Sequence, residues 1–208
     1  MAGRFLVPDG EAVCELAVRN SRFLGRARAC LTADEARDLV KRERAEHPGA
    51  SHVVHAFILG DPRSETSGLS DDGEPRGTAG RPVFEVLKGS GIRNVLLTVT
   101  RWFGGTKLGT GGLVKAYGAC AKETLKRLPT RVFLPLVRAR LELSYHWHEP
   151  ARRALAAAGG RVLGGDFGET VRLELELPEQ ALEDFRAALG AGERSGAVRW
   201  GTEPFEFS

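Results

Sequence analysis

The residues best suited to chemistry lie in residues 101–112, "RWFGGTKLGTGG", which we call the glycine segment. An apolar run, "NVLLTVT", precedes it, and an amphipathic helical pattern, "LVKAYGACAKETLKRL", follows it. Glycines adopt positive φ angles and let a ligand come close to the backbone. The first N–H groups of a helix have no partner inside the helix, and the helix dipole adds partial positive charge there. The segment therefore predicts a site for an anion such as phosphate.

The spacing of these glycines matches neither a Walker A loop nor the pattern GxGxxG. A tight turn, in which the glycines only let the helix pack against the strand, is the alternative interpretation. The groups that would form the anion site are Lys107, Gly109, Thr110, Gly111 and Gly112.

Aromatic and basic residues flank these glycines. Trp102 and Phe103 directly follow the predicted strand, so one should cover the core while the other could stack on a base or pack against a partner. Arg101 could be a structural ion-pair partner or a phosphate clamp. The further candidates for contact with an anion or a nucleic acid are Arg26, Arg28, Gly104, Gly105, Lys115, Lys122 and Lys126.

An acidic stretch, "SDDGEPRGT", is the second unusual feature. Its carboxylates, together with Glu65 of the same loop, could bind magnesium or calcium, or act as general acid and base, although the spacing is not that of an EF-hand. A solvated loop with a turn at Asp72-Gly73 is the favoured interpretation. Alternatively, one of the aspartates pairs with Arg76, Arg81 or Arg101 and closes the loop over the basic site. The residues of this motif loop are Asp71, Asp72, Gly73, Glu74, Arg76 and Thr78.

Composition indicates a folded, water-soluble protein. Hydrophobic residues make up 42% of the 208 residues and charged residues 27%. No apolar stretch is long enough to cross a membrane, and the first residues lack the apolar core of a secretory signal. Three scattered cysteines predict neither disulfides nor a zinc site. We therefore expect a cytoplasmic protein that has no membrane partner, no metal and no cofactor.

The patterning predicts two domains, 1–132 and 133–208. In the first, strands are expected at 11–18, 22–29, 51–59 and 94–100, and a long loop covers 60–78. A capping box at Thr32 and Glu35 opens the first helix, and Thr78 is expected to cap a helix from 79 to 88. In the second, the order is strand 136–145, helix 149–158, strands 160–165 and 169–177, helix 178–189 and strand 196–206, which is the βαββαβ order of a ferredoxin-like domain.

"SDDGEPRGTAGRPV" followed by "TRWFGGTKLGTGGLVKAYG" resembles the signature of the IMPACT family, in its bacterial YigZ-type form. The resemblance covers about residues 11–128 and implies an α+β fold: a first domain like domain 2 of ribosomal protein S5, an α/β sandwich in two layers, and a ferredoxin-like second domain. Eukaryotic members of the family regulate translation. For bacterial members the family suggests binding to nucleic acid or to the ribosome and implies no reaction.

Three functions follow from these observations. The favoured one is a non-enzymatic protein that binds RNA or the ribosome through the basic first domain, where residues 1–134 hold 21 Lys and Arg but 15 Asp and Glu. The second is an adaptor that docks a protein partner. The third is an enzyme acting on a phosphorylated small molecule or a nucleotide, with magnesium held by the acidic loop. An enzyme is disfavoured because the sequence shows no convincing pair of nucleophile and base.

Overall fold

The computed structural model describes residues 4–201, which fold into two compact units. The first runs from Arg4 to Phe133, and the second begins at Leu134. Within this range, no helix combines the length and the apolar character that a membrane span needs. The α+β class and the two-domain arrangement agree with the prediction.

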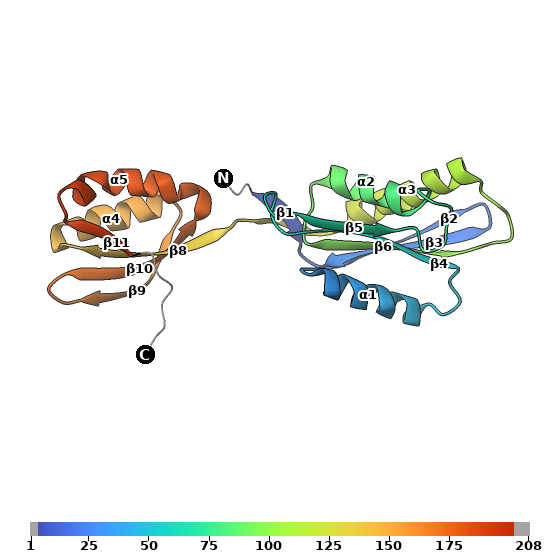
Figure 1. Cartoon of the computed structure of the whole chain (residues 1–208), viewed down its shortest axis with the longest axis horizontal. Coiled ribbons are helices and arrows are strands. Elements are labelled where there is room, and N and C mark those ends of the chain that lie inside the picture. The colour runs from blue at the N-terminus through green and yellow to red at the C-terminus, as the bar shows by residue number, and fades with distance from the viewer. Residues whose placement is uncertain (1–3, 202–208) are drawn as a thin grey trace. The chain divides into compact units, whose positions relative to one another are not determined.

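The first unit is built on a five-stranded antiparallel sheet in the order β2-β3-β6-β4-β5. The central strand, β6, is buried at every residue except its last, which explains why most of its residues are apolar; its buried polar residues are Thr98, Thr100 and Arg101. Helices α2 and α3 cover one face and α1 covers the other (Figure 1), so α1 adds a layer to the predicted sandwich. The strands are β2 (Ala12–Val18), β3 (Ser21–Ala29), β4 (His52–Leu59), β5 (Thr66–Ser70) and β6 (Val95–Trp102). The helices are α1 (Ala33–Glu46), α2 (Gly80–Ser90) and α3 (Thr110–Arg127).

Each face of the sheet has its own apolar core. The larger core lies beneath α2 and α3, where Phe23 meets Tyr117 edge to face at 5.2 Å. The smaller one lies beneath α1 and includes Leu59 and Leu96. Side chains alternate along each strand, so residues of one parity on β3 and β6 face α3 while their neighbours face α1.

The prediction of a continuous loop over residues 60–78 is wrong for the middle of this range. Residues Thr66–Ser70 form the edge strand β5, which pairs with β4 from His55↔Ser70 to Leu59↔Thr66. The sequence "TSGLS" has little hydrophobic content because an edge strand lies half in solvent. A glycine is required at position 68, where a Cβ would lie 2.5 Å from the ring of Phe57.

A short ribbon of β1 (Phe5–Pro8) and β7 (Thr130–Phe133) also escaped prediction. These segments lie at opposite ends of the first unit's sequence, and four-residue strands carry too little alternation to be recognised. The ribbon brings Phe5 and Phe133 to a ring distance of 5.0 Å.

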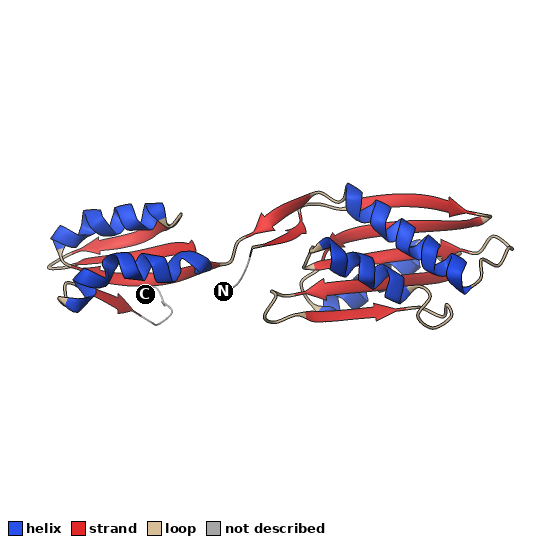
Figure 2. Ribbon diagram, turned by 90° about the horizontal axis from the view of Figure 1, so that it is seen from above, coloured by secondary structure: helices blue, strands red, loops and turns tan. Residues whose placement is uncertain are grey.

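The second unit has the predicted βαββαβ order, with a four-stranded sheet in the order β11-β8-β10-β9 and two helices on one face (Figure 2). The helix α4 begins four residues earlier than predicted, and residues 202–206 of the expected last strand lie outside the described residues. The elements are β8 (Leu136–Leu143), α4 (Tyr145–Ala157), β9 (Arg161–Phe167), β10 (Val171–Pro178), α5 (Leu182–Arg194), which follows a single 3₁₀ turn, and β11 (Val198–Gly201).

The open face of this second sheet carries charges that neutralise one another across the strands. Arg172 lies opposite Glu142, and Arg140 lies opposite Glu174. Their charged atoms are 3.8 and 3.9 Å apart. In the strand "VRLELEL", Val171 and the leucines that follow it at every second position are buried, so this strand turns its apolar residues to the core and its charged residues to the open face.

Candidate nucleic-acid interface

The glycine segment joins the end of β6 to the start of α3. Gly109 is the N-cap of α3, with φ at +72°, and no side chain caps the helix. The first bond into the helix runs from the N–H of Leu113 to the carbonyl of Gly109 at 2.9 Å. Among residues 4–201, none accepts a hydrogen bond from the N–H groups of Thr110, Gly111 or Gly112. These three donors lie at the positive end of the helix dipole.

Hydrogen bonds to serine side chains from other parts of the first unit hold the start of the glycine segment in place. The N–H of Phe103 donates to Ser51 Oγ at 3.1 Å, and the N–H of Gly104 lies 3.4 Å from Ser21 Oγ. A Cβ at residue 104 would lie only 1.7 Å from the carbonyl oxygen of Asn20, so the close approach of these two backbones requires glycine.

The two aromatic residues take different places. The guanidinium of Arg22 lies 3.7 Å from the centre of the Trp102 ring, and His47 meets the same ring edge to face. Phe103 is 48% exposed. Trp102 is therefore the covering residue, and Phe103 is the exposed ring, with the guanidinium of Arg101 5.5 Å from its centre.

The lysines of the candidate surface are exposed. In the described part of the chain, Lys107, Lys115 and Lys122 form no ion pair, whereas Lys126 pairs with Glu123 at 2.6 Å. Sequence reasoning missed Arg19, whose Nη1 lies 3.4 Å from the carbonyl oxygen of Lys107. Its backbone has φ at +42°, which is unusual for arginine, and no motif in the sequence links it to residues 88 positions further on.

Arg101 requires a correction, because it is not an exposed phosphate clamp. It is 4% exposed, and its Nη1 pairs with Glu74 Oε1 at 2.6 Å while its Nη2 donates to Ser21 Oγ at 3.2 Å. The hydroxyl of the buried Tyr117 donates to the same oxygen of Glu74 at 2.7 Å. Burial, and then the neighbouring Glu74, raise the pKa of Tyr117 far above its usual range, so the hydroxyl keeps its proton.

The acidic residues of the motif loop are engaged by the fold. Asp71 accepts hydrogen bonds from the N–H groups of Gly77, Ala79 and Gly80 at 2.7, 3.0 and 2.8 Å. Burial alone would raise its pKa, but these donors outweigh that effect and lower it. Asp72 pairs with Arg44 at 2.5 Å and accepts from the N–H of Val53 at 2.6 Å. The aspartates therefore pair with none of the arginines proposed from sequence, and the loop is not simply solvated.

Thr78 does not cap α2 as predicted. The helix begins at Gly80, and the Thr78 hydroxyl donates to the carbonyl of Pro75 at 2.6 Å. Asp71 satisfies the N–H groups at this helix start instead, from nine positions earlier in the chain.

Arg26 and Arg28 also require a correction, because they lie on the α1 face of the sheet, away from α3 and its lysines. Glu43 of α1 is fully buried, and its Oε2 pairs with Arg28 at 2.7 Å and with Arg26 at 3.2 Å. Arg26 also pairs with Glu46 at 2.8 Å. We therefore remove both arginines from the candidate surface.

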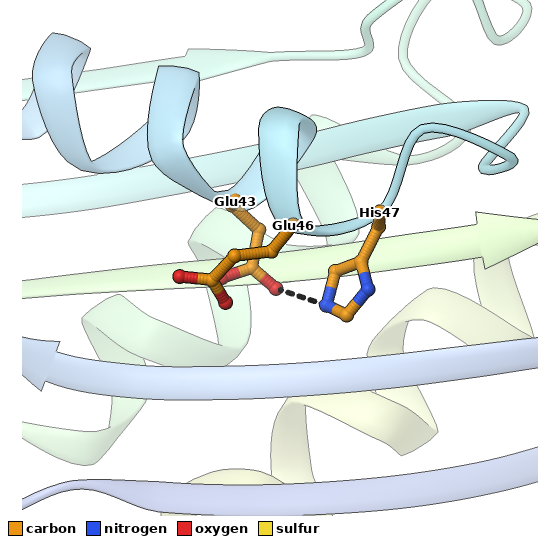
Figure 3. Close-up of side chains that lie close together, drawn as sticks. All are labelled: Glu43, Glu46 and His47. Carbon is orange, nitrogen blue, oxygen red and sulfur yellow. Dashed lines mark ion pairs between the residues drawn. The ribbon is translucent and has the colours of Figure 1, made fainter.

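Within the described residues, the group with the geometry of a metal site is Glu43, Glu46 and His47, whose ligand atoms lie within 4.8 Å of one another (Figure 3). The oxygens of Glu43 are already engaged, one by the two arginines and the other by Thr100 and His47, each at 3.4 Å. The ion pairs account for this arrangement without a cation.

Fold and site together define a two-domain α+β protein whose first domain presents an exposed glycine segment over a buried ion pair. Residues 19–125 match the family model of the Impact N-terminal domain, and residues 141–190 match that of a domain of unknown function, DUF1949. The chain belongs to the IMPACT family, as its motifs predicted.

The alignments with similar proteins cover both units. IMPACT family member YigZ of Escherichia coli is 36% identical over 186 residues, which cover 89% of this chain and 91% of that one. An IMPACT family member of Haemophilus influenzae is 32% identical, with 89% and 90% covered. The crystal structure of a hypothetical protein, 34% identical, aligns over 98% of both chains with a TM-score of 0.66.

Proposed function

We propose that the chain is a non-enzymatic cytoplasmic protein that binds RNA, free or within the ribosome, and acts in the regulation of translation. The observation that carries this proposal is the set of N–H groups at Thr110, Gly111 and Gly112, which have no acceptor in the described chain. Membership of the IMPACT family supports the link to translation, because the family resemblance implies that role for its eukaryotic members.

The surroundings of these donors suit a nucleic acid better than a lone phosphate. Lys107 adds a full charge beside them, and Lys115 and Lys122 extend the positive charge along α3. Phe103 offers an open ring on which a base can stack, a contact typical of proteins that bind single strands. Phosphate contacts would supply affinity, and stacking would favour unpaired bases over duplex.

The enzymatic alternative has less support. It required carboxylates free to hold magnesium, but Asp71, Asp72 and Glu74 are bonded to backbone N–H groups, to Arg44 and to Arg101. Glu65 is also paired, with Arg93 at 2.7 Å. The adaptor alternative keeps one supporting observation, since Phe103 and Val114 are apolar and exposed.

Fluorescence anisotropy with a labelled single-stranded uridine oligomer, repeated over a salt series, tests the proposal. Lys107→Ala should weaken binding and reduce the slope of log Kd against log salt by about 0.7, the value for one phosphate contact on a single strand. Lys88→Ala is the matched control, because Lys88 is an exposed lysine near the far end of α2 and should leave the slope unchanged.

The proposal fails if neither the oligomer nor purified ribosomes bind at low salt, or if both lysine variants change the slope equally. A partner that survives nuclease treatment, and is lost with Phe103→Ala but not with Lys107→Ala, would favour the adaptor instead.

A further inference from the structure

We propose that Glu74 is a positioning residue that holds the two ends of the glycine segment, so that its N–H groups and the Phe103 ring keep a fixed geometry. This inference rests on the proposed function, because it concerns how the same site is kept ready for RNA. Glu74 itself is buried and would not contact the ligand.

One oxygen atom makes both attachments. Oε1 of Glu74 lies 2.6 Å from Nη1 of Arg101, the first residue of the glycine segment, at the end of β6. The same oxygen accepts the hydroxyl proton of Tyr117, on α3 just beyond the segment, at 2.7 Å. The strand and the helix, which the chain connects through the glycine segment, are thus also joined directly by these side chains.

The attachments are strong because they are charged and shielded from water. Arg101 is 4% exposed, Glu74 is 8% exposed and Tyr117 is fully buried. Hydrogen bonds to ionised groups are stronger than those between neutral groups, and a low local dielectric strengthens them further. Because Tyr117 keeps its proton, its hydroxyl is the donor and Glu74 the acceptor, and the hydrogen bond does not run in the opposite direction.

A second group extends the network to the segment itself. Ser21 Oγ lies 3.2 Å from Nη2 of Arg101 and 3.4 Å from the N–H of Gly104. Orientation of Arg101 by Glu74 therefore also orients the serine that contacts the segment. Because glycine-rich chain loses more conformational entropy than other chain when it is ordered, a segment fixed in advance binds its ligand at lower cost.

The test compares Tyr117→Phe with Thr124→Val in the full chain. Y117F removes only the hydroxyl and keeps the ring against Phe23. T124V is the matched control, since Thr124 is a buried residue of the same helix whose hydroxyl bonds the carbonyl of Cys120 and not the network. Both should lower the melting temperature, Y117F by more, because its hydroxyl bonds an ionised carboxylate whereas that of Thr124 bonds a neutral carbonyl.

In Y117F we expect hydrogen exchange at the bonded amides of Phe103, Gly104 and Leu113 to accelerate about tenfold and the Kd for the uridine oligomer to rise about tenfold. T124V should leave both at the wild-type values. Glu74→Gln should change both in the same direction as Y117F and by more, because it also leaves Arg101 without its anionic partner.

The positioning role is overturned if Y117F and E74Q leave exchange across the segment as slow as it is in T124V. This outcome is separate from the fate of the proposed function. If the wild-type chain binds no RNA but exchange accelerates in Y117F, the positioning role stands and the RNA proposal fails. If RNA binds and Y117F changes neither exchange nor Kd, the RNA proposal stands and the positioning role fails.

Discussion

Replacement of Glu43 by glutamine tests whether the arginines on the α1 face are structural. Glu43→Gln preserves the size of the side chain and an acceptor oxygen but removes the charge that faces Arg28 at 2.7 Å and Arg26 at 3.2 Å. The arginine side chains are only 11% and 18% exposed, so water cannot replace the lost carboxylate well. Arg26 keeps Glu46 as a partner, whereas Arg28 forms no other ion pair within the described residues.

Removal of one partner of a buried ion pair costs about 3–5 kcal/mol, and the remaining Glu46 contact places the expected loss near the lower end, about 3 kcal/mol. For a domain of this size, such a loss lowers the melting temperature by roughly 10 °C. Glu15→Gln is the matched control, because Glu15 pairs with Arg22 at 3.7 Å on the exposed surface. That variant should change stability by less than about 1 kcal/mol.

Scanning calorimetry of the full chain provides the measurement, with the transition of the first unit followed in each variant. RNA affinity measured below the transition should be unchanged in E43Q, because α1 covers the opposite face from α3. The reasoning is refuted if E43Q unfolds within about 2 °C of E15Q, a difference of about 0.5 kcal/mol. It is also refuted if a folded E43Q protein loses its RNA affinity.

Three further predictions concern the site and its frame. Phe103→Ala should weaken RNA binding by about 1–3 kcal/mol through lost stacking, while Phe167→Ala, at an equally exposed phenylalanine of the second unit, should not change Kd in the same anisotropy assay. Gly104→Ala should lower the melting temperature of the first unit, since its Cβ would overlap the carbonyl of Asn20; an unchanged value would contradict the close approach. Burial lowers the pKa of His55, so the unfolded chain takes up the proton first and stability should fall as the pH drops below about 6.5. Urea titrations of His55→Gln at pH 5 and 7 should show a smaller difference in unfolding free energy than the wild type, and an equal difference would exclude this role.

Local sequence patterns predicted many of the helices and strands that position the site. The capping box is present, with the N–H of Glu35 bonded to Thr32 Oγ1 at 3.1 Å, although the Glu35 carboxylate reaches back to the N–H of Leu31 rather than to that of Thr32. The alternation of "VRLELEL" gave the buried face of β10 because a residue's side is fixed by its position along the strand. These features depend on neighbours within a few positions.

Features that depend on distant parts of the chain were not predictable in this way. Because side chains alternate along a strand, Arg26 and Arg28 lie on one face of β3, but the sequence could not show that α1 would bring Glu43 to that face. In the same way, Arg101 finds Glu74 across 27 positions, and Asp71 rather than Thr78 satisfies the start of α2. A charged residue in a motif can be taken for a ligand-binding residue, because the sequence does not show which distant residue pairs with it in the fold.

The central claim is that the start of α3 binds RNA phosphates, and an NMR titration of the ¹⁵N-labelled chain with the uridine oligomer tests it most directly. The account predicts that the amide signals of Thr110, Gly111 and Gly112 shift progressively, saturate with the anisotropy Kd and return towards their free positions as salt is added. Signals of these three amides that stay unmoved at saturating RNA, with shifts confined to other surfaces, would contradict it.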